Sequence, residues 1–158
     1  MSSLELFQWF YATPIAETIR NSTWLFPVIE AFHLLGLGLT VGSVLLVELR
    51  LLGVGLSRQP VAQLAASAEP LLIGGLTLSF LTGIPLFLSE SIKAYYSFAF
   101  WIKMISLFLA LLFTFTIRRR LTRTDLTAER PRLGRAMAIV SLRLWFGVAW
   151  GGRWIGFS

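Results

Sequence analysis

The sequence predicts an all-α integral membrane protein: a four-helix bundle preceded by a short amphipathic helix. Of its 158 residues, 56% are apolar and only 14% are charged, against about 25% charged residues in a typical soluble domain. Four stretches approach the ~20 apolar residues that a helix needs to cross a bilayer. These candidate spans are residues 24–47, 70–89, 94–117 and 136–157. We therefore expect residues 1–158 to form a single membrane domain.

The four spans differ in the charges that they contain. The first has one formal charge, Glu30, and the second has none. Lys103 alone interrupts the third, whereas the fourth carries Arg143 and Arg153. The link "ESIKAYY" between the second and third spans is short, so these two helices should be antiparallel neighbours.

Before the first span, residues 3–20 form an amphipathic segment. Its aromatic and apolar side chains suit the headgroup zone of a membrane, and they are Leu4, Phe7, Trp9, Phe10 and Tyr11. Thr13 followed by Pro14 predicts a helix start, because a threonine side chain can cap a helix and proline is favoured in its first turn.

The positive charge lies mainly in one loop. Seven of the fourteen basic residues fall in "RRRLTRTDLTAERPRLGR" between the third and fourth spans. Arginines in short loops mark the cytoplasmic side of a membrane protein, which predicts a multi-pass protein of the bacterial inner membrane with both termini outside. This placement favours contact with anionic lipids over nucleic-acid binding. The chain has no cysteine, which excludes disulfides, thiolate metal sites and iron–sulfur clusters.

Ionisable residues inside a span are costly and indicate a functional site. At about 1.5 Å per residue from the outer ends of the spans, Glu30 lies ~9 Å deep, His33 and Lys103 ~13 Å, and Arg153 ~6 Å. Glu30 and His33 are three residues apart and share a helix face. We therefore expect these four side chains to converge in the outer half of the bundle.

Two structural alternatives remain open. The outer residues can instead form an ion-pair network, Glu30 with Lys103 or Arg153, that only holds the helices together. A second candidate pair lies in the inner half, where Glu48 or Arg50 can meet Arg143. We interpret that inner pair as structural, because arginines near a membrane surface can extend toward water.

His33, the only histidine, is a candidate metal ligand. Gly36 follows one turn later and leaves room for a flat macrocycle, which favours haem with Lys103 and Arg153 at its propionates. The Glu-x-x-His spacing from Glu30 also resembles di-iron bundles, which need carboxylates from further helices. Gly38 and Gly42 form a G-x-x-x-G pattern on the opposite face, where another helix can approach closely.

Several motifs carry a family resemblance. They are "WLFPVIEAFHLLGLGLTVGSVLLVELRLLG", "FWIKMISL" and "LWFGVAWGGRWIGF". Together they resemble a small bacterial membrane family of the DUF6644 type over nearly the whole chain. The layout is more distantly similar to the CopD-like group and to HemJ-type protoporphyrinogen oxidases. Counterparts in the latter are His33, Gly42, Arg50-Leu51 and the "WIK" of Trp101 to Lys103.

This resemblance implies haem b, with His33 as the axial iron ligand and Lys103 as its functional companion. The expected function is electron transfer or oxidoreduction at the outer half of the bilayer, with a quinol or a tetrapyrrole as substrate and Glu30 and Lys103 as catalytic residues. The chain has no second histidine, so a sixth iron ligand would be Lys103, Met104, water or a group from another subunit. A homo-oligomer is expected. The alternative is a non-catalytic transport or scaffold protein with a Glu/His/Lys relay or packing network.

Overall fold

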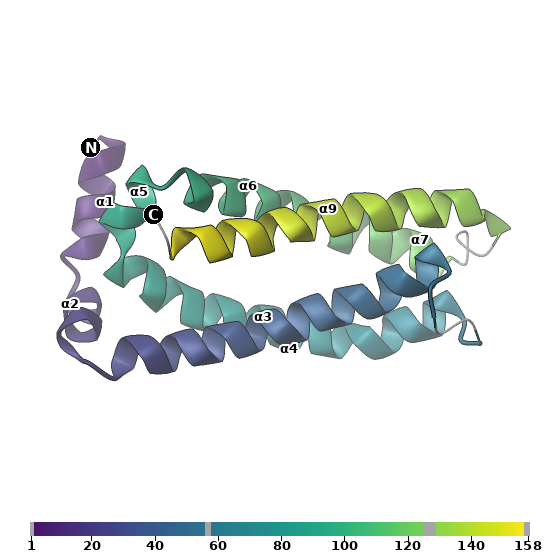
Figure 1. The fold of residues 1–158 in the computed structure, drawn as a ribbon, viewed down its shortest axis with the longest axis horizontal. Helices are drawn as coiled ribbons and strands as arrows, with labels where there is room; N and C mark the ends of the chain where they lie inside the picture. Colours follow the sequence, from purple (N-terminus) through teal and green to yellow (C-terminus); the bar gives the residue numbers. More distant parts are fainter. Residues whose placement is uncertain (1, 56–57, 125–128, 157–158) are drawn as a thin grey trace.

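The protein is an all-α bundle with four helices long and apolar enough to cross a membrane, which confirms the predicted fold class (Figure 1). The computed structural model describes residues 2–55, 58–124 and 129–156. The helices in chain order are α1 (Ser3–Tyr11), α2 (Pro14–Asn21), α3 (Leu25–Leu52), α4 (Val61–Ser89), α5 (Ser91–Tyr96), α6 (Phe98–Phe113), the π-helix η1 (Thr114–Arg118), α7 (Arg119–Arg123) and α9 (Pro131–Ile155). The third span consists of α6, η1 and α7 and runs from Phe98 to Arg123.

The two ends of the bundle differ. We call the end that holds the chain termini, α1, α2 and α5 the terminal end, and the end that holds α7 the arginine end (Figure 1). All four spans are longer at the arginine end than predicted: α3 reaches Leu52, α4 starts at Val61, the third span reaches Arg123 and α9 starts at Pro131. Hydropathy marks only the apolar part of a helix, and the backbone hydrogen bonds continue into the polar flanks.

The predicted amphipathic segment forms two short helices. Ser2 and Glu5 make a reciprocal capping box at the start of α1, and the Thr13 side chain caps α2 with Pro14 in its first turn. Phe7 in α1 packs edge-on against Phe87 and Tyr95, with ring centroids 5.6 and 5.1 Å apart. These contacts hold α1 against α4 and α5 at the terminal end.

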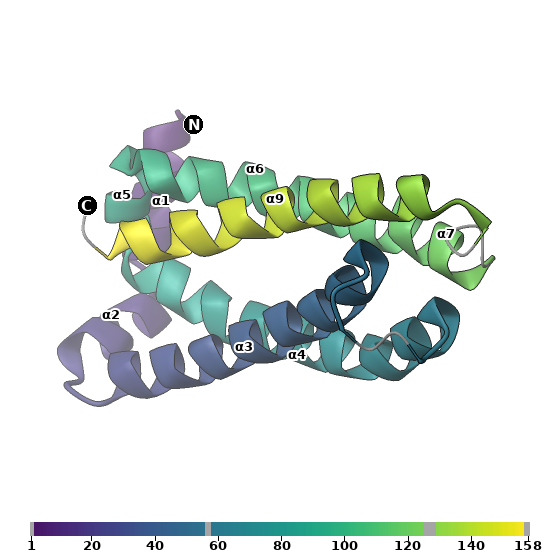
Figure 2. The same ribbon diagram turned by 45° about the vertical axis from the view of Figure 1, so that its right-hand side comes forward.

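The spans associate as two antiparallel pairs, α3 with α4 and α6 with α9 (Figures 1 and 2). Small residues let the α3 and α4 backbones meet: a Cβ on Gly36 would lie 2.9 Å from the Gly75 carbonyl oxygen, and one on Gly75 would lie 2.8 Å from that of Gly36. In the other pair, a Cβ on Gly151 would lie 2.8 Å from the Ala99 carbonyl oxygen. Close approach at small residues is a usual way for helices to associate in membranes.

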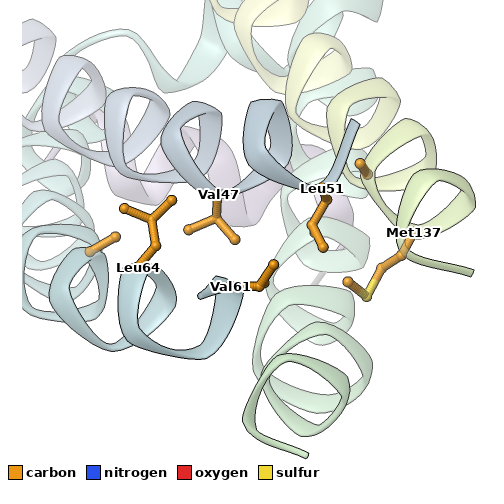
Figure 3. Close-up of a cluster of buried hydrophobic side chains, with 7 residues drawn as sticks. Val47, Leu51, Val61, Leu64 and Met137 are labelled. Atoms are coloured by element: carbon orange, nitrogen blue, oxygen red, sulfur yellow. The ribbon is translucent and has the colours of Figure 1, made fainter. Parts of the chain in front are cut away.

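The apolar core is concentrated in the middle of the bundle and at its arginine end. One buried cluster joins Val47, Leu51, Val61, Leu64, Ala68, Met137 and Ala138 (Figure 3). A second lies nearer the centre and contains Val44, Leu72, Leu76, Ala110, Trp145 and Val148. By contrast, none of α3 residues 25–35 is buried. The first part of α3 is therefore packed less tightly than the rest of that helix.

The glycine contacts predict a position-dependent effect of adding one methyl group. Gly36→Ala should destabilise the fold by about 1–3 kcal/mol, because the new Cβ meets α4 backbone that cannot move without separating the helices. Gly38→Ala is the matched control, since a Cβ there meets nothing within 4 Å. Unfolding in mixed detergent micelles measures both free energies. Equal effects would contradict the observed pairing.

Candidate functional site

His33 lies on α3 in the terminal half, and hydrogen bonds hold its ring against α4. Its Nδ1 is 3.0 Å from the Ser79 carbonyl oxygen and 3.0 Å from Thr82 Oγ1. Thr82 donates its own hydroxyl hydrogen to the Leu78 carbonyl oxygen at 2.6 Å, so it accepts from the ring. A carbonyl oxygen can only accept. Nδ1 is therefore assigned as the N–H donor of the neutral imidazole, which leaves the lone pair on Nε2.

Gly83 gives the imidazole its place beside α4. A Cβ at this position would lie 3.1 Å from His33 Cε1, which is closer than ordinary van der Waals contact. Ser79, Thr82 and Gly83 on α4 thus form the surface that the His33 ring contacts. Sequence reasoning did not find them, because their only signal is the spacing of small and hydroxyl residues along an otherwise apolar span.

Lys103 reaches the same region from α6. Its stem packs against α9, since a Cβ on Gly151 would lie 2.9 Å from Lys103 Cβ and one on Gly152 would lie 3.7 Å from its Nζ. The Lys103 charge is also close enough to His33 to act on it electrostatically. Lys103 and His33 thus approach the same region from different helices.

Two other expected members of the site lie on the protein surface. Glu30 is exposed, and no hydrogen bond or ion pair joins it to His33 or Lys103 in the described part of the chain. The 28 residues of α3 span about 42 Å against a bilayer core of about 30 Å, so Glu30 lies near the edge of that core. Arg153 is likewise exposed, close to the end of α9. The expected convergence of all four side chains is thus wrong for Glu30.

The glycine interpretation also needs correction. The space beside Gly36 is filled by α4, since a Cβ there would lie 2.7 Å from Ser79 Oγ. Gly36 thus serves helix packing and leaves no room for a flat ring in this arrangement. Conversely, nothing lies within 4 Å of a Cβ at Gly38 or Gly42, so the predicted G-x-x-x-G pair does not face another helix of this chain.

In the arginine half, the predicted partner of Glu48 is wrong. Glu48 Oε1 accepts from Arg118 Nε at 2.8 Å, whereas Arg143 is exposed on α9 and Arg50 Nε donates to the Gln59 carbonyl oxygen at 2.8 Å. The Glu48 side chain is 0% exposed and that of Arg118 is 8% exposed. Arg118 ends the π-helix η1, a local widening that often marks functional sites.

The described residues contain no group of three or more His, Cys, Asp and Glu side chains able to hold a metal ion. A di-iron centre within one chain therefore gains no support from the structure. His33 remains a single candidate ligand with a lone pair on Nε2, which would suit an axial position on a macrocycle whose four other iron ligands come from the cofactor itself.

Comparison with known proteins identifies the family. The model of a family of unknown function, DUF6644, matches residues 21–158. The chain belongs to this family. No curated protein and no solved structure matches it. The DUF6644 prediction is thereby confirmed, whereas the more distant resemblance to the CopD-like group and to HemJ-type oxidases has no support from these comparisons.

Proposed function

We propose that this DUF6644 protein is a membrane b-type haem protein that works in electron transfer or oxidoreduction, with His33 as its axial ligand. The observation that carries the proposal is the hydrogen bonding of His33. Its Nδ1–H is held by the Ser79 carbonyl oxygen at 3.0 Å, so the neutral ring presents Nε2 as an available ligand. A carbonyl acceptor behind a ligand histidine fixes its tautomer and orientation and raises its basicity.

The surroundings of His33 support the same proposal. None of α3 residues 25–35 is buried, which leaves apolar surface along this part of α3 for a macrocycle at a position other than Gly36. Lys103 supplies a cation near His33 that can pair with a propionate.

When bound, haem would supply one-electron chemistry, and the chain would supply orientation and charge. Ser79 and Thr82 hold the imidazole, and Lys103 would hold an anionic group of the cofactor or of a substrate. A quinol or a tetrapyrrole is the proposed substrate class, because both are delivered from or through the lipid phase. Glu30, at the edge of the bilayer core, is placed to exchange protons with water rather than to orient His33.

The membrane topology is also proposed. The arginine end would face the cytoplasm of a bacterial inner membrane, and the terminal end would face outside, because arginine-rich short loops stay on the cytoplasmic side. A second copy of the chain could supply a sixth iron ligand, since the chain has one histidine. This would make the functional unit a homo-oligomer.

The test is the absorption spectrum of the purified wild-type protein after expression with ample haem supply. We expect a Soret band and a haem content of one per chain, or one per two chains if two His33 rings share an iron. Reduction by a soluble quinol should shift the band. A folded, helical and colourless protein would contradict the proposal.

The second candidate is a non-catalytic transport or scaffold protein. The observation in its favour is that the His33 hydrogen bonds also join α3 to α4, so they could serve only to hold the two helices together. Such hydrogen bonds contribute about 0.6 kcal/mol each on average in membrane proteins. The same absorption spectrum distinguishes the two candidate functions, because a histidine that only joins helices binds no chromophore.

A further inference from the structure

The arginine half of the bundle contains a group of buried polar atoms that no protein contact satisfies. Within the described residues, the buried side-chain atoms with no hydrogen-bond partner include Glu48 Oε2, Thr114 Oγ1, Ser141 Oγ and Trp145 Nε1. Their residues are 0%, 2%, 1% and 4% exposed. Burial of an unpaired polar group costs about 1–3 kcal/mol, and each such group in a native protein calls for a partner.

These atoms lie in one region. Arg118 donates to Glu48 Oε1, and Thr114 lies four residues before Arg118 in the same π-helix. Ser141 lies beside the Glu48 carboxylate, although the geometry falls short of a hydrogen bond. Trp145 follows Ser141 by one turn of α9. The region thus draws on three spans.

A cavity adjoins this region. It has a volume of about 40 Å³, and its walls include Ser43, Leu72, Thr114 and Arg118. Leu72 also belongs to the buried cluster that contains Trp145, so the cavity borders the same group of packed side chains as the indole. A cavity needs about 10–15 Å³ for each water that it holds, and each water needs two to four polar partners. The cavity therefore has room for about three waters.

The cavity has a route to the surface at the arginine end. Glu69, Arg119 and Arg123 also line it, and their side chains are 22%, 44% and 61% exposed. Glu69 is paired with both arginines, at 2.6 and 3.2 Å, so these charges are balanced at the mouth. A neutral hydrogen-bonding ligand fits this set of donors and acceptors better than an ion.

We propose that Glu48, Thr114, Ser141 and Trp145 bind a short chain of water molecules that connects the buried Glu48 carboxylate to the aqueous phase at the arginine end. The hydroxyls donate and accept, the indole N–H donates, and Glu48 Oε2 accepts, so water can satisfy every unpaired atom of the group. This gives Glu48 a hydrogen-bonded path to water independent of the His33 region.

X-ray radiolytic footprinting of the wild-type protein tests the proposal, because ionised water forms hydroxyl radicals where it is bound and no probe has to enter. Trp145 should be oxidised several-fold faster than Met137, as read by mass spectrometry of peptides. Met137 is the matched control, since it is equally buried at 4%, has an oxidisable side chain and lies in the apolar cluster of Figure 3.

The same measurement on a Thr114→Val variant is the second part of the experiment. The substitution keeps the shape of the side chain but removes a water ligand, and it should slow Trp145 oxidation several-fold without changing that of Met137. Oxidation of Trp145 no faster than that of Met137 in the wild-type protein would overturn the proposal. So would a folded Thr114→Val variant with unchanged Trp145 oxidation.

Discussion

Replacing His33 with alanine should abolish the Soret band while the protein stays inserted in the membrane. His33 is the only imidazole in the chain, so no other histidine of the same subunit can replace it. Its hydrogen bonds to α4 contribute only about 0.6 kcal/mol each, and the bundle should persist without them. The measurement is the absorption spectrum and haem content of the purified variant beside those of the wild type.

Glu30→Gln is the control for that experiment. Glu30 lies on the same helix but is exposed, so its replacement should leave the Soret band in place. Full retention of the spectrum in His33→Ala would contradict the assignment of the ligand. Equal loss in both variants would point to a defect of α3 as a whole rather than to ligation.

The largest effect on stability is expected at Arg118. Arg118→Met leaves the Glu48 carboxylate buried without its partner, and removal of one member of a buried ion pair costs about 3–5 kcal/mol. The free energy of unfolding in mixed detergent micelles measures this loss. Glu48→Met combined with Arg118→Met should recover most of it, because replacement of both charges by apolar groups of similar size is often neutral.

Arg123→Met is the matched control for Arg118. Arg123 pairs with Glu69 at 3.2 Å, but its side chain is 61% exposed, and exposed pairs contribute about 0–1 kcal/mol. Its loss should therefore be small. If Arg118→Met were as mild as Arg123→Met, the Glu48–Arg118 pair would not hold the arginine half together.

The spans were predictable because each is a local property of the chain. A run of apolar residues long enough to cross a bilayer must form a helix, since its backbone groups have no other hydrogen-bond partners in lipid. The capping of α2 by Thr13 was likewise readable from adjacent residues. Helix lengths were underestimated, because the polar flanks at the arginine end continue the same backbone hydrogen bonding.

The contacts between spans were less predictable. Helical periodicity gives the face on which a residue lies but not which helix covers that face. Gly36 was therefore interpreted as space for a cofactor although α4 packs against it, and Gly38 as a packing site although nothing lies within 4 Å of a Cβ there. Arg118 was counted among the loop arginines, whereas the π-helix turns it toward Glu48. Depth along a helix also does not say which way a side chain points, so it did not show that Glu30 is exposed.

The most direct test of the central claim uses the single histidine of the chain. Growth with [¹⁵N]histidine places the isotope in one residue per subunit, and pulsed electron paramagnetic resonance of the ferric protein detects ¹⁵N nuclei bound to iron. We predict a ¹⁵N hyperfine coupling of the strength that direct coordination produces. A ferric haem signal without that coupling would show that His33 is not the ligand and would contradict the account.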